Sequence, residues 1–190
     1  MIKMSNLEER GQGTEQESIP PHGGELVWLV AEGKEGEEVS ARACSFPKLF
    51  LSLQESLDLE MIATGVYSPL QGFMGQKDYQ SVLQNKRLTS GLPWTIPITL
   101  AGSPSQASQL TEGKEVLLCA PSGNPLGCLL LEEKFPSDKR KEAREVFLTE
   151  DLQHPGVANL FNRGEVLLAG AVRIFSRMVS DFPSYRMDPR

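Results

Sequence analysis

Two stretches in the first half of the chain carry apolar residues at helical spacing. Ser52 and Glu55 have the spacing of a capping box, in which each side chain accepts a hydrogen bond from the backbone N–H of the other residue. We expect a helix from there to Gly65, which supplies a left-handed stop. Its predicted buried face consists of Leu53, Leu57 and Met61. A second helix is expected at residues 77–85. Its apolar face contains Tyr79, Val82 and Leu83.

Alternating patterns and continuous apolar runs predict strands elsewhere. The expected strands cover residues 24–30, 93–100, 116–120, 126–133 and 165–175. Residues 116–133 have the form of a β-hairpin around a Ser-Gly-Asn-Pro turn. In the strand at 93–100, Pro97 indicates a sheet edge or a bulge, and one face is apolar: Trp94, Ile96, Ile98 and Leu100. The remaining segments are predicted to be loops at 32–38 and 103–115, and a charged helix at 137–147 capped by Ser137.

Strands outnumber helices in this pattern, and the two do not alternate regularly. This is typical of an α+β domain with a mixed or barrel-like β-sheet and a few short helices, rather than of a doubly wound α/β fold. We assign the domain to residues 20–178. Residues 1–19 are rich in Glu, Gln, Ser and Gly and are predicted to be a disordered tail. Residues 179–190 are polar and interrupted by proline, as in a linker.

Composition narrows the class of protein. The chain has 190 residues, enough for one full domain, and a net charge of −6, which disfavours a nucleic-acid binder that depends on a basic surface. No signal peptide and no apolar segment long enough to cross a membrane is recognised, so we expect a cytoplasmic protein. Cys119 and Cys128 flank the hairpin turn and might face each other, but two reduced thiols in the core are the favoured interpretation.

No catalytic constellation can be assembled from the residues alone. The chain has no Gly-x-x-x-x-Gly-Lys phosphate loop, no Cys-x-x-Cys pair and no His-x-x-His spacing. His22 and His154 each lie beside glycine and proline, and we expect each imidazole to hydrogen-bond local backbone rather than to act in catalysis. The basic run at 139–141 alternates with acidic residues and is interpreted as a solvated helix face. We therefore assign no catalytic, cofactor-binding or metal-binding residue.

Five segments, in the same order, resemble motifs of one family, the sulfate adenylyltransferases or ATP sulfurylases. They are PHGGEL at 21–26, TGVYSPLQGFM at 64–74, LPWTIPITL at 92–100, HPGV at 154–157 and DFPSYRMDP at 181–189. Each motif is weak alone, but five in register are specific. The resemblance implies an N-terminal domain with a PUA-like fold. Its partner would be a nucleotidyltransferase domain, in the same polypeptide or as a separate chain, and a homo-oligomer is possible.

In that family the adenylyl-transfer chemistry belongs to a second domain with a Gln-x-Arg-Asn-Pro-x-His-x-x-His signature, which does not occur in these 190 residues. The resemblance therefore implies a structural or assembly domain without cofactor, ATP being a substrate of the parent enzyme. The alternative is a free-standing PUA-like module that binds RNA, against which the acidic charge weighs. Sulfate assimilation and sulfur oxidation both remain open as pathways.

The segment at 64–74 is too apolar for an ordinary surface loop. Pro69 fixes an extended entry and Gly72 permits a tight reversal. The side chains expected to dock onto the sheet are Tyr67, Leu70, Phe73 and Met74. We interpret this segment as a structural clasp between the two helices rather than as a substrate loop.

Overall fold

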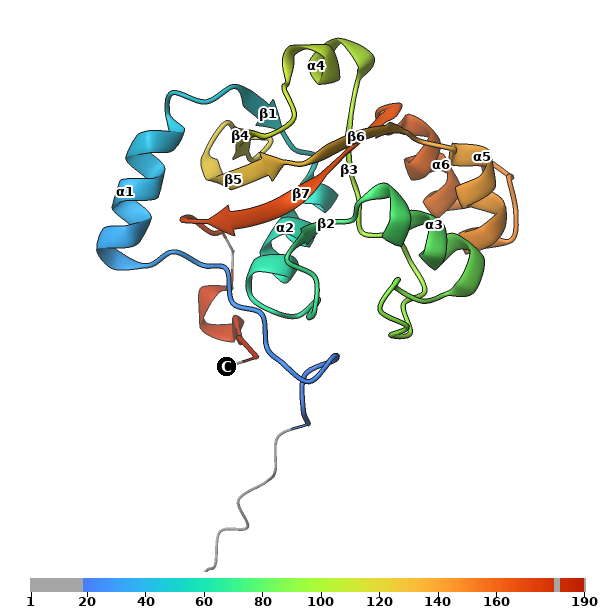
Figure 1. Cartoon of the computed structure of the whole chain (residues 1–190), viewed down its shortest axis with the longest axis horizontal. Helices are drawn as coiled ribbons and strands as arrows, with labels where there is room; N and C mark the ends of the chain where they lie inside the picture. Colours follow the sequence, from blue (N-terminus) through green and yellow to red (C-terminus); the bar gives the residue numbers. More distant parts are fainter. Residues whose placement is uncertain (1–18, 180–181, 190) are drawn as a thin grey trace, which may run out of the picture.

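The computed structural model describes residues 19–179 and 182–189, and within these ranges a mixed β-sheet organises the chain (Figure 1). Its strands run in the order β1-β4-β5-β7-β2, and β3 and β6 also pair with β7. The β1–β4 pair is parallel, and the other pairs are antiparallel. The strands are β1 (Lys48–Phe50), β2 (Gly72–Phe73), β3 (Leu100–Gly102), β4 (Lys114–Cys119), β5 (Pro125–Leu131), β6 (Glu133–Pro136) and β7 (Val166–Ile174). The predicted α+β class and the strand at 165–175 are confirmed, and that strand is the centre of the sheet.

Short helices surround this sheet (Figure 1). They are α1 (Gly33–Ala43), α2 (Leu53–Ala63), α3 (Gln76–Asn85), α4 (Pro104–Gln109), α5 (Lys139–Glu142), α6 (Pro155–Asn162), the π-helical turn η1 (Ala143–Phe147) and the 3₁₀ turn η2 (Pro183–Tyr185). In the view of Figure 1, α1 lies at one end of the sheet, α3, α5 and α6 gather at the other end, and α2 lies near the middle.

The local signals for α2, α3 and the hairpin are confirmed. Ser52 Oγ accepts a hydrogen bond from Glu55 N (3.2 Å), and Glu55 Oε2 accepts one from Ser52 N (2.9 Å). Gly65 ends the helix with a φ of 85°. The predicted apolar face of α3 is buried: Tyr79, Val82 and Leu83. Strands β4 and β5 form the expected hairpin.

The outward and inward faces of α2 are the reverse of the prediction. Leu53, Leu57 and Met61 are 60%, 39% and 37% exposed. The residues that α2 buries are Glu55, Ser56, Asp58, Leu59, Ile62 and Ala63. Glu55 can point inward because its second oxygen, Oε1, accepts a hydrogen bond from Ala101 N at 3.0 Å, which satisfies the buried carboxylate.

Two predictions near the N-terminus are wrong. Residues 24–30 form no strand. Val30 makes an isolated bridge to Ile174, and the segment instead runs beside α2, with Leu29 N donating to Ala63 O (2.8 Å). The acidic residues predicted as a loop at 32–38 belong to α1. This helix forms because its less polar side packs on the hairpin, in a cluster that contains Val39, Ala43, Leu117, Cys119 and Cys128.

Three further boundaries differ from the prediction. Only the end of 93–100 enters the sheet, as β3, and Ile96 is exposed; two prolines leave its backbone few ladder hydrogen bonds. The predicted loop at 103–115 contains α4, which has its own capping box of Ser103 and Gln106. The cap of α5 is Asp138 and not Ser137: Asp138 Oδ1 accepts a hydrogen bond from Lys141 N at 3.0 Å.

The clasp at 64–74 packs as expected. Leu70, Phe73 and Met74 are buried and Tyr67 is partly buried. Gly72 lies so close to β7 that a Cβ atom there would collide with the carbonyl oxygen of Gly170. Since these side chains belong to the main hydrophobic cluster, the segment has a structural role.

The hairpin cysteines are free and buried, which confirms the favoured interpretation. In the hairpin register Cys128 lies opposite Leu117 and Cys119 lies opposite Pro125, so the two thiols do not face each other. Burial raises the pKa of the Cys128 thiol to about 11 and also raises that of Cys119. Both thiols are therefore protonated at neutral pH.

Candidate functional site

A broad open cleft of about 1130 Å³ lies beside α2. One wall is the N-terminal half of α2, a second is the segment 93–99, and a third comes from η1, α6 and the turn that follows α6. The walls include exposed apolar side chains, Phe50, Leu53 and Ile96, and buried acids also line the cleft. A cleft with apolar walls and a few converging polar groups is the usual form of a binding site.

Asp58 is one of three buried acids that line this cleft, with Glu55 and Glu142. It extends from the inward flank of α2 and accepts hydrogen bonds from Gln54 Nε2 (3.1 Å) and Tyr67 Oη (3.3 Å). Burial raises the pKa of the Asp58 carboxyl, and the two hydrogen bonds and the charge of Arg163 oppose that rise without cancelling it. Burial also raises the pKa of the Tyr67 phenol, and the charge of Asp58 and its hydrogen bond with the phenol act in the same direction.

Glu142 is another of these buried acids, and it lies at the end of α5. Its carboxylate accepts a hydrogen bond from Tyr79 Oη at 2.8 Å, and Arg163 Nη1 is 4.0 Å away. Burial raises the pKa of Glu142, although the Tyr79 hydrogen bond and the charges of Arg163 and Lys139 act in the opposite direction. Arg163 Nη2 in turn donates to Thr99 O (2.8 Å) and Oγ1 (2.7 Å). Glu142 and Arg163 thus connect α5, the turn after α6 and the segment before β3.

The two histidines have structural contacts at separate places. His22 Nε2 is 3.0 Å from Pro93 O, so it does bind backbone, but backbone 71 residues away rather than local. Its ring also lies 6.0 Å from that of Trp94. His154 precedes α6 without capping it, and its ring lies 5.1 Å from that of Phe147. The prediction that each imidazole bonds local backbone is therefore wrong, since His22 bonds distant backbone and His154 contacts the ring of Phe147. Neither histidine lines the cleft.

The basic run on α5 is not simply a solvated face. Lys139 Nζ donates to the carbonyl oxygens of Phe161 (3.0 Å) and Arg163 (2.5 Å) at the C-terminus of α6. The lysine charge there satisfies carbonyls that a helix end leaves without an intrahelical partner.

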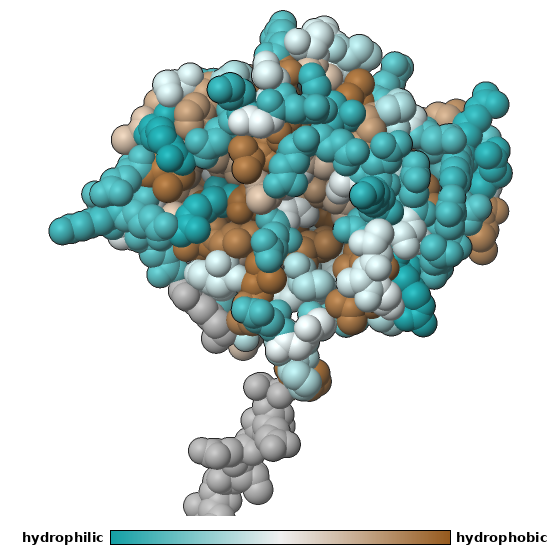
Figure 2. All heavy atoms as spheres, in the orientation of Figure 1, coloured by the Kyte–Doolittle hydropathy of each residue, from teal (hydrophilic) through white to brown (hydrophobic). Residues whose placement is uncertain are grey.

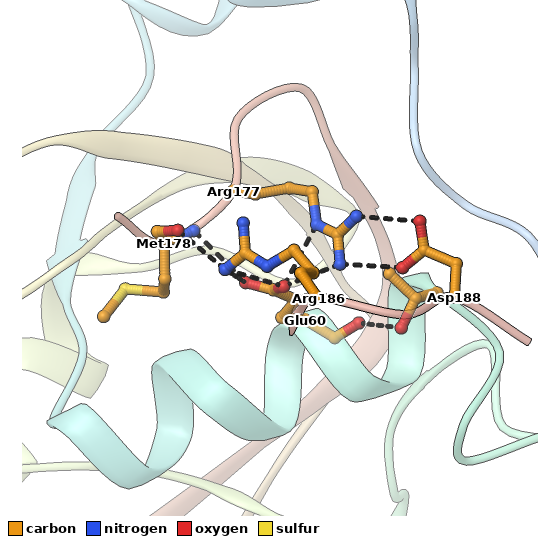
Figure 3. Close-up of polar contacts among 6 residues, drawn as sticks. Glu60, Arg177, Met178, Arg186 and Asp188 are labelled. Atoms are coloured by element: carbon orange, nitrogen blue, oxygen red, sulfur yellow. Dashed lines mark hydrogen bonds and ion pairs between the residues drawn. The ribbon is translucent and has the colours of Figure 1, made fainter. Parts of the chain in front are cut away.

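An ion-pair cluster lies on the other flank of α2 (Figure 3). Glu60 Oε1 accepts hydrogen bonds from Arg177 Nε (3.0 Å) and Nη2 (2.9 Å), and Arg186 Nη2 is 3.2 Å from the same oxygen. Arg177 also pairs with Asp188 through two hydrogen bonds of 2.9 Å. Burial acts to lower the pKa of Arg177, but its bonds to Asp188 and Glu60 raise it overall.

The cluster holds the segment 182–189 against α2. Arg186 Nη2 donates to Met178 O at 2.8 Å, and Met178 N donates to Glu60 Oε2 at 3.2 Å. The described part of the predicted linker therefore has a defined position on the domain. Bidentate arginine–carboxylate pairs of this kind fix geometry as well as charge.

Within residues 19–179 and 182–189 no helix has the length and hydropathy that a membrane span requires. The same ranges contain no group of three or more His, Cys, Asp or Glu side chains arranged to hold a metal ion.

Residues 19–177 match the family model described as a PUA-like domain. The chain belongs to this family. It is 46% identical over 174 residues to a sulfate adenylyltransferase of Synechococcus sp. (strain JA-3-3Ab), with 91% of this chain and 44% of the relative covered. It is also 45% identical over 172 residues to a probable bifunctional SAT/APS kinase 2 of Sorangium cellulosum (strain So ce56), covering 90% of this chain and 30% of that protein.

Among solved structures, a hexameric APS kinase from Thiobacillus denitrificans matches with a TM-score of 0.70 and 29% identity, over 90% of this chain and 30% of that one. The chain thus spans less than half the length of these relatives. The predicted resemblance to the N-terminal PUA-like domain of sulfate adenylyltransferases is confirmed. The RNA-binding alternative is not favoured, since the relatives named are enzymes of sulfate activation.

Proposed function

We propose that this chain serves as the N-terminal PUA-like domain of a sulfate adenylyltransferase and acts as a structural and assembly domain beside the catalytic part. The reaction of the whole enzyme would convert ATP and sulfate to adenylyl sulfate and pyrophosphate. The observation that carries the proposal is the match of nine-tenths of this chain to less than half of the length of such enzymes. The function would be exercised in the cytoplasm, where reduced Cys119 and Cys128 are stable.

Contacts within the domain favour a structural role over a catalytic one. The polar groups of the cleft bind one another, as Tyr79 binds Glu142 and Arg163 binds Thr99. Stabilisation of charge on the phosphates in adenylyl transfer needs donors directed at the substrate, and removal of one such donor typically costs about 10²–10³ in rate. We assign those donors, and the binding of ATP, to the catalytic part of the enzyme.

The test compares two proteins. One is this chain alone, and the other is a chimera in which this chain replaces the matching stretch of the Synechococcus sp. (strain JA-3-3Ab) enzyme. ATP formation from adenylyl sulfate and pyrophosphate is measured for both, with the unaltered enzyme as reference. We expect turnover by the chimera and none by the chain alone. Turnover by the chain alone at a rate comparable with the chimera would refute the assignment, and so would a folded chimera without activity.

A further inference from the structure

The outward face of α2 is the most unusual surface of the described residues. Leu53, Leu57 and Met61 are separated by four residues each, so they form one continuous stripe along the helix. All three are exposed. Exposed apolar side chains normally occur singly on a protein surface, so three in one stripe are unusual. Figure 2 shows that apolar surface, in brown, is exposed among hydrophilic side chains near the middle of the viewed face. We call the stripe of these three residues the α2 stripe.

The cleft extends the apolar surface on one flank of the α2 stripe. Leu53 belongs to both, and the exposed side chains of Phe50 and Ile96 line the same cleft. By helical position, Gln54 and Asp58 lie on this flank. The hydrogen-bond donors recorded for the Asp58 carboxyl, Gln54 and Tyr67, are both neutral.

The ion-pair cluster borders the other flank of the α2 stripe. Glu60 lies there by helical position and holds Arg186 of the segment 182–189 (Figure 3). Arg186 and Asp188 are directed to the cluster, while the adjacent residues Tyr185 and Met187 are exposed. The segment therefore presents apolar side chains outward while its charged side chains anchor it.

We propose that the α2 stripe, with the cleft rim at Phe50 and Ile96, is the surface on which the catalytic part of the sulfate adenylyltransferase docks. This inference rests on the proposed function. The partner face is apolar and carries one arginine or lysine whose side chain enters the cleft toward Asp58. Aromatic and aliphatic anchors surrounded by polar groups are the normal composition of an interface core.

Length and charge favour this occupant over the others. The relatives have more than half of their length outside the stretch that matches this chain, which covers 44% of the Synechococcus enzyme. Of the charged side chains that line the cleft, three are acids and one, Arg163, is a cation, so a cation from the partner would be attracted to it. A symmetric dimer would instead bring the same acidic cleft of two copies together, in a chain whose net charge is −6.

The experiment is hydroxyl-radical footprinting of this chain alone and of the chimera described above, read by mass spectrometry. Met61 reports on the α2 stripe, and the exposed Leu152, outside the cleft, is the internal control. We expect oxidation of Met61 to be about tenfold slower in the chimera, because an interface core excludes water, and oxidation of Leu152 to be unchanged. Equal oxidation of Met61 in both proteins would overturn the proposal. If Met61 of the isolated chain becomes more protected as the concentration of the chain rises, the surface binds a second copy of the chain. That result would also overturn the proposal.

Charged variants identify the surface independently. Leu57→Asp in the chimera should return Met61 oxidation to the rate of the isolated chain, and Leu152→Asp should not. Leu53→Asp, at the more exposed end of the α2 stripe, provides a second variant if Leu57→Asp lowers the melting temperature of the isolated chain. Full protection of Met61 in all three variants would contradict the docking surface.

Failure of the inference and failure of the proposed function give different results. A chimera that turns over while Met61 stays as reactive as in the isolated chain retains the proposed function and loses the docking surface. A folded chimera that protects Met61 but does not turn over retains the docking surface and loses the proposed function.

Discussion

At the residue scale, several side chains are directed by single polar interactions rather than by hydropathy. Glu55 is buried because its two oxygens accept hydrogen bonds from Ser52 N and Ala101 N. Glu142 is buried with the phenol of Tyr79 as donor. Such groups restrict the packing of the elements around them, since a buried carboxylate without its donors is costly. Phe73 and Glu142 provide two tests at this scale.

Replacement of Phe73 by alanine should lower the free energy of unfolding by about 3–5 kcal/mol, the usual cost of truncating a buried aromatic side chain. Phe73 is 3% exposed and joins β2 to the main hydrophobic cluster. Urea unfolding followed by circular dichroism measures the change. Phe50→Ala is the matched control, because Phe50 also belongs to a short strand but is exposed, and it should cost no more than about 1 kcal/mol. Equal losses for the two variants would show that Phe73 does not anchor the clasp.

Glu142→Gln should change the pH dependence of stability. Burial raises the pKa of Glu142, so the folded protein binds a proton at pH values where the unfolded chain has released it. The contribution of this carboxyl to the free energy of unfolding is therefore complete below its ordinary pKa and is lost as pH rises through the raised value. The glutamine variant stays neutral, so its stability relative to the original protein should increase between about pH 4 and neutrality. Unfolding curves across this range measure the difference, and a difference that shrinks with rising pH would contradict the argument.

At the element scale, β7 decides the architecture, since β2, β3, β5 and β6 all pair with it. The approach of β2 to β7 is close enough that its first residue must be glycine. The clasp that precedes this strand contributes Leu70 to the core, and Met74, which follows the strand, donates a backbone hydrogen bond to Ile98 O at 3.0 Å. The clasp thus connects α2, the central strand and the segment leading to β3.

Gly72→Ala should destabilise the domain by roughly 1–3 kcal/mol or more, as in other overpacked sites, because the added Cβ meets backbone that cannot rotate away. The control is Gly102→Ala in β3, where the nearest atom to a Cβ would be Leu168 Cδ1, at the end of a flexible side chain, at 3.3 Å. Thermal unfolding of both variants should show the larger decrease in melting temperature for Gly72→Ala. Equal melting temperatures for the two variants would disprove the close β2–β7 contact.

At the scale of the whole molecule, α2 connects two surfaces. Its inward flank forms part of the cleft with α6 and the segment 93–99, and its other flank carries the ion-pair cluster with Arg177 and Arg186. Between them lies the α2 stripe. The cluster determines where the segment 182–189 lies on the domain, and this arrangement can be tested on this chain alone.

Glu60→Gln should release the segment 182–189, because one carboxylate pairs with both arginines. Trypsin cleavage after Arg186 should become several-fold faster, since cleavage follows local opening of the segment. Mass spectrometry of the fragments measures the rate. Glu37→Gln is the control, since Glu37 is an exposed acid on α1, and it should leave the cleavage rate unchanged. An unchanged rate in Glu60→Gln would show that the cluster does not hold the segment.

The disordered tail predicted at residues 1–19 falls outside the described residues except for Ile19, and its mobility stays a prediction. So does the assignment of 179–190 as a linker to a further domain, although its described residues contact α2. Hydrogen exchange measured along the whole chain addresses both segments.

The sequence by itself determined the features that depend on neighbouring residues. The capping box of Ser52 and Glu55, the stop at Gly65 and the hairpin around the Ser-Gly-Asn-Pro turn are short-range signals, and each is found as predicted. The five family motifs, also read from the sequence alone, indicated the PUA-like fold and the family of the relatives. Helical spacing also identified Leu53, Leu57 and Met61 as one face of a helix.

Only the tertiary structure decided which face of α2 is buried, because periodicity defines a stripe but not the surface against which a helix packs. It also made a helix of the acidic segment 33–43, which packs on the hairpin, and left only Leu100 of the strand predicted at 93–100 in the sheet. The cleft and the ion-pair cluster are likewise tertiary: Glu60 and Arg186 are 126 positions apart. Their attraction has no local signature, since it arises only after β7 brings the end of the chain back to α2.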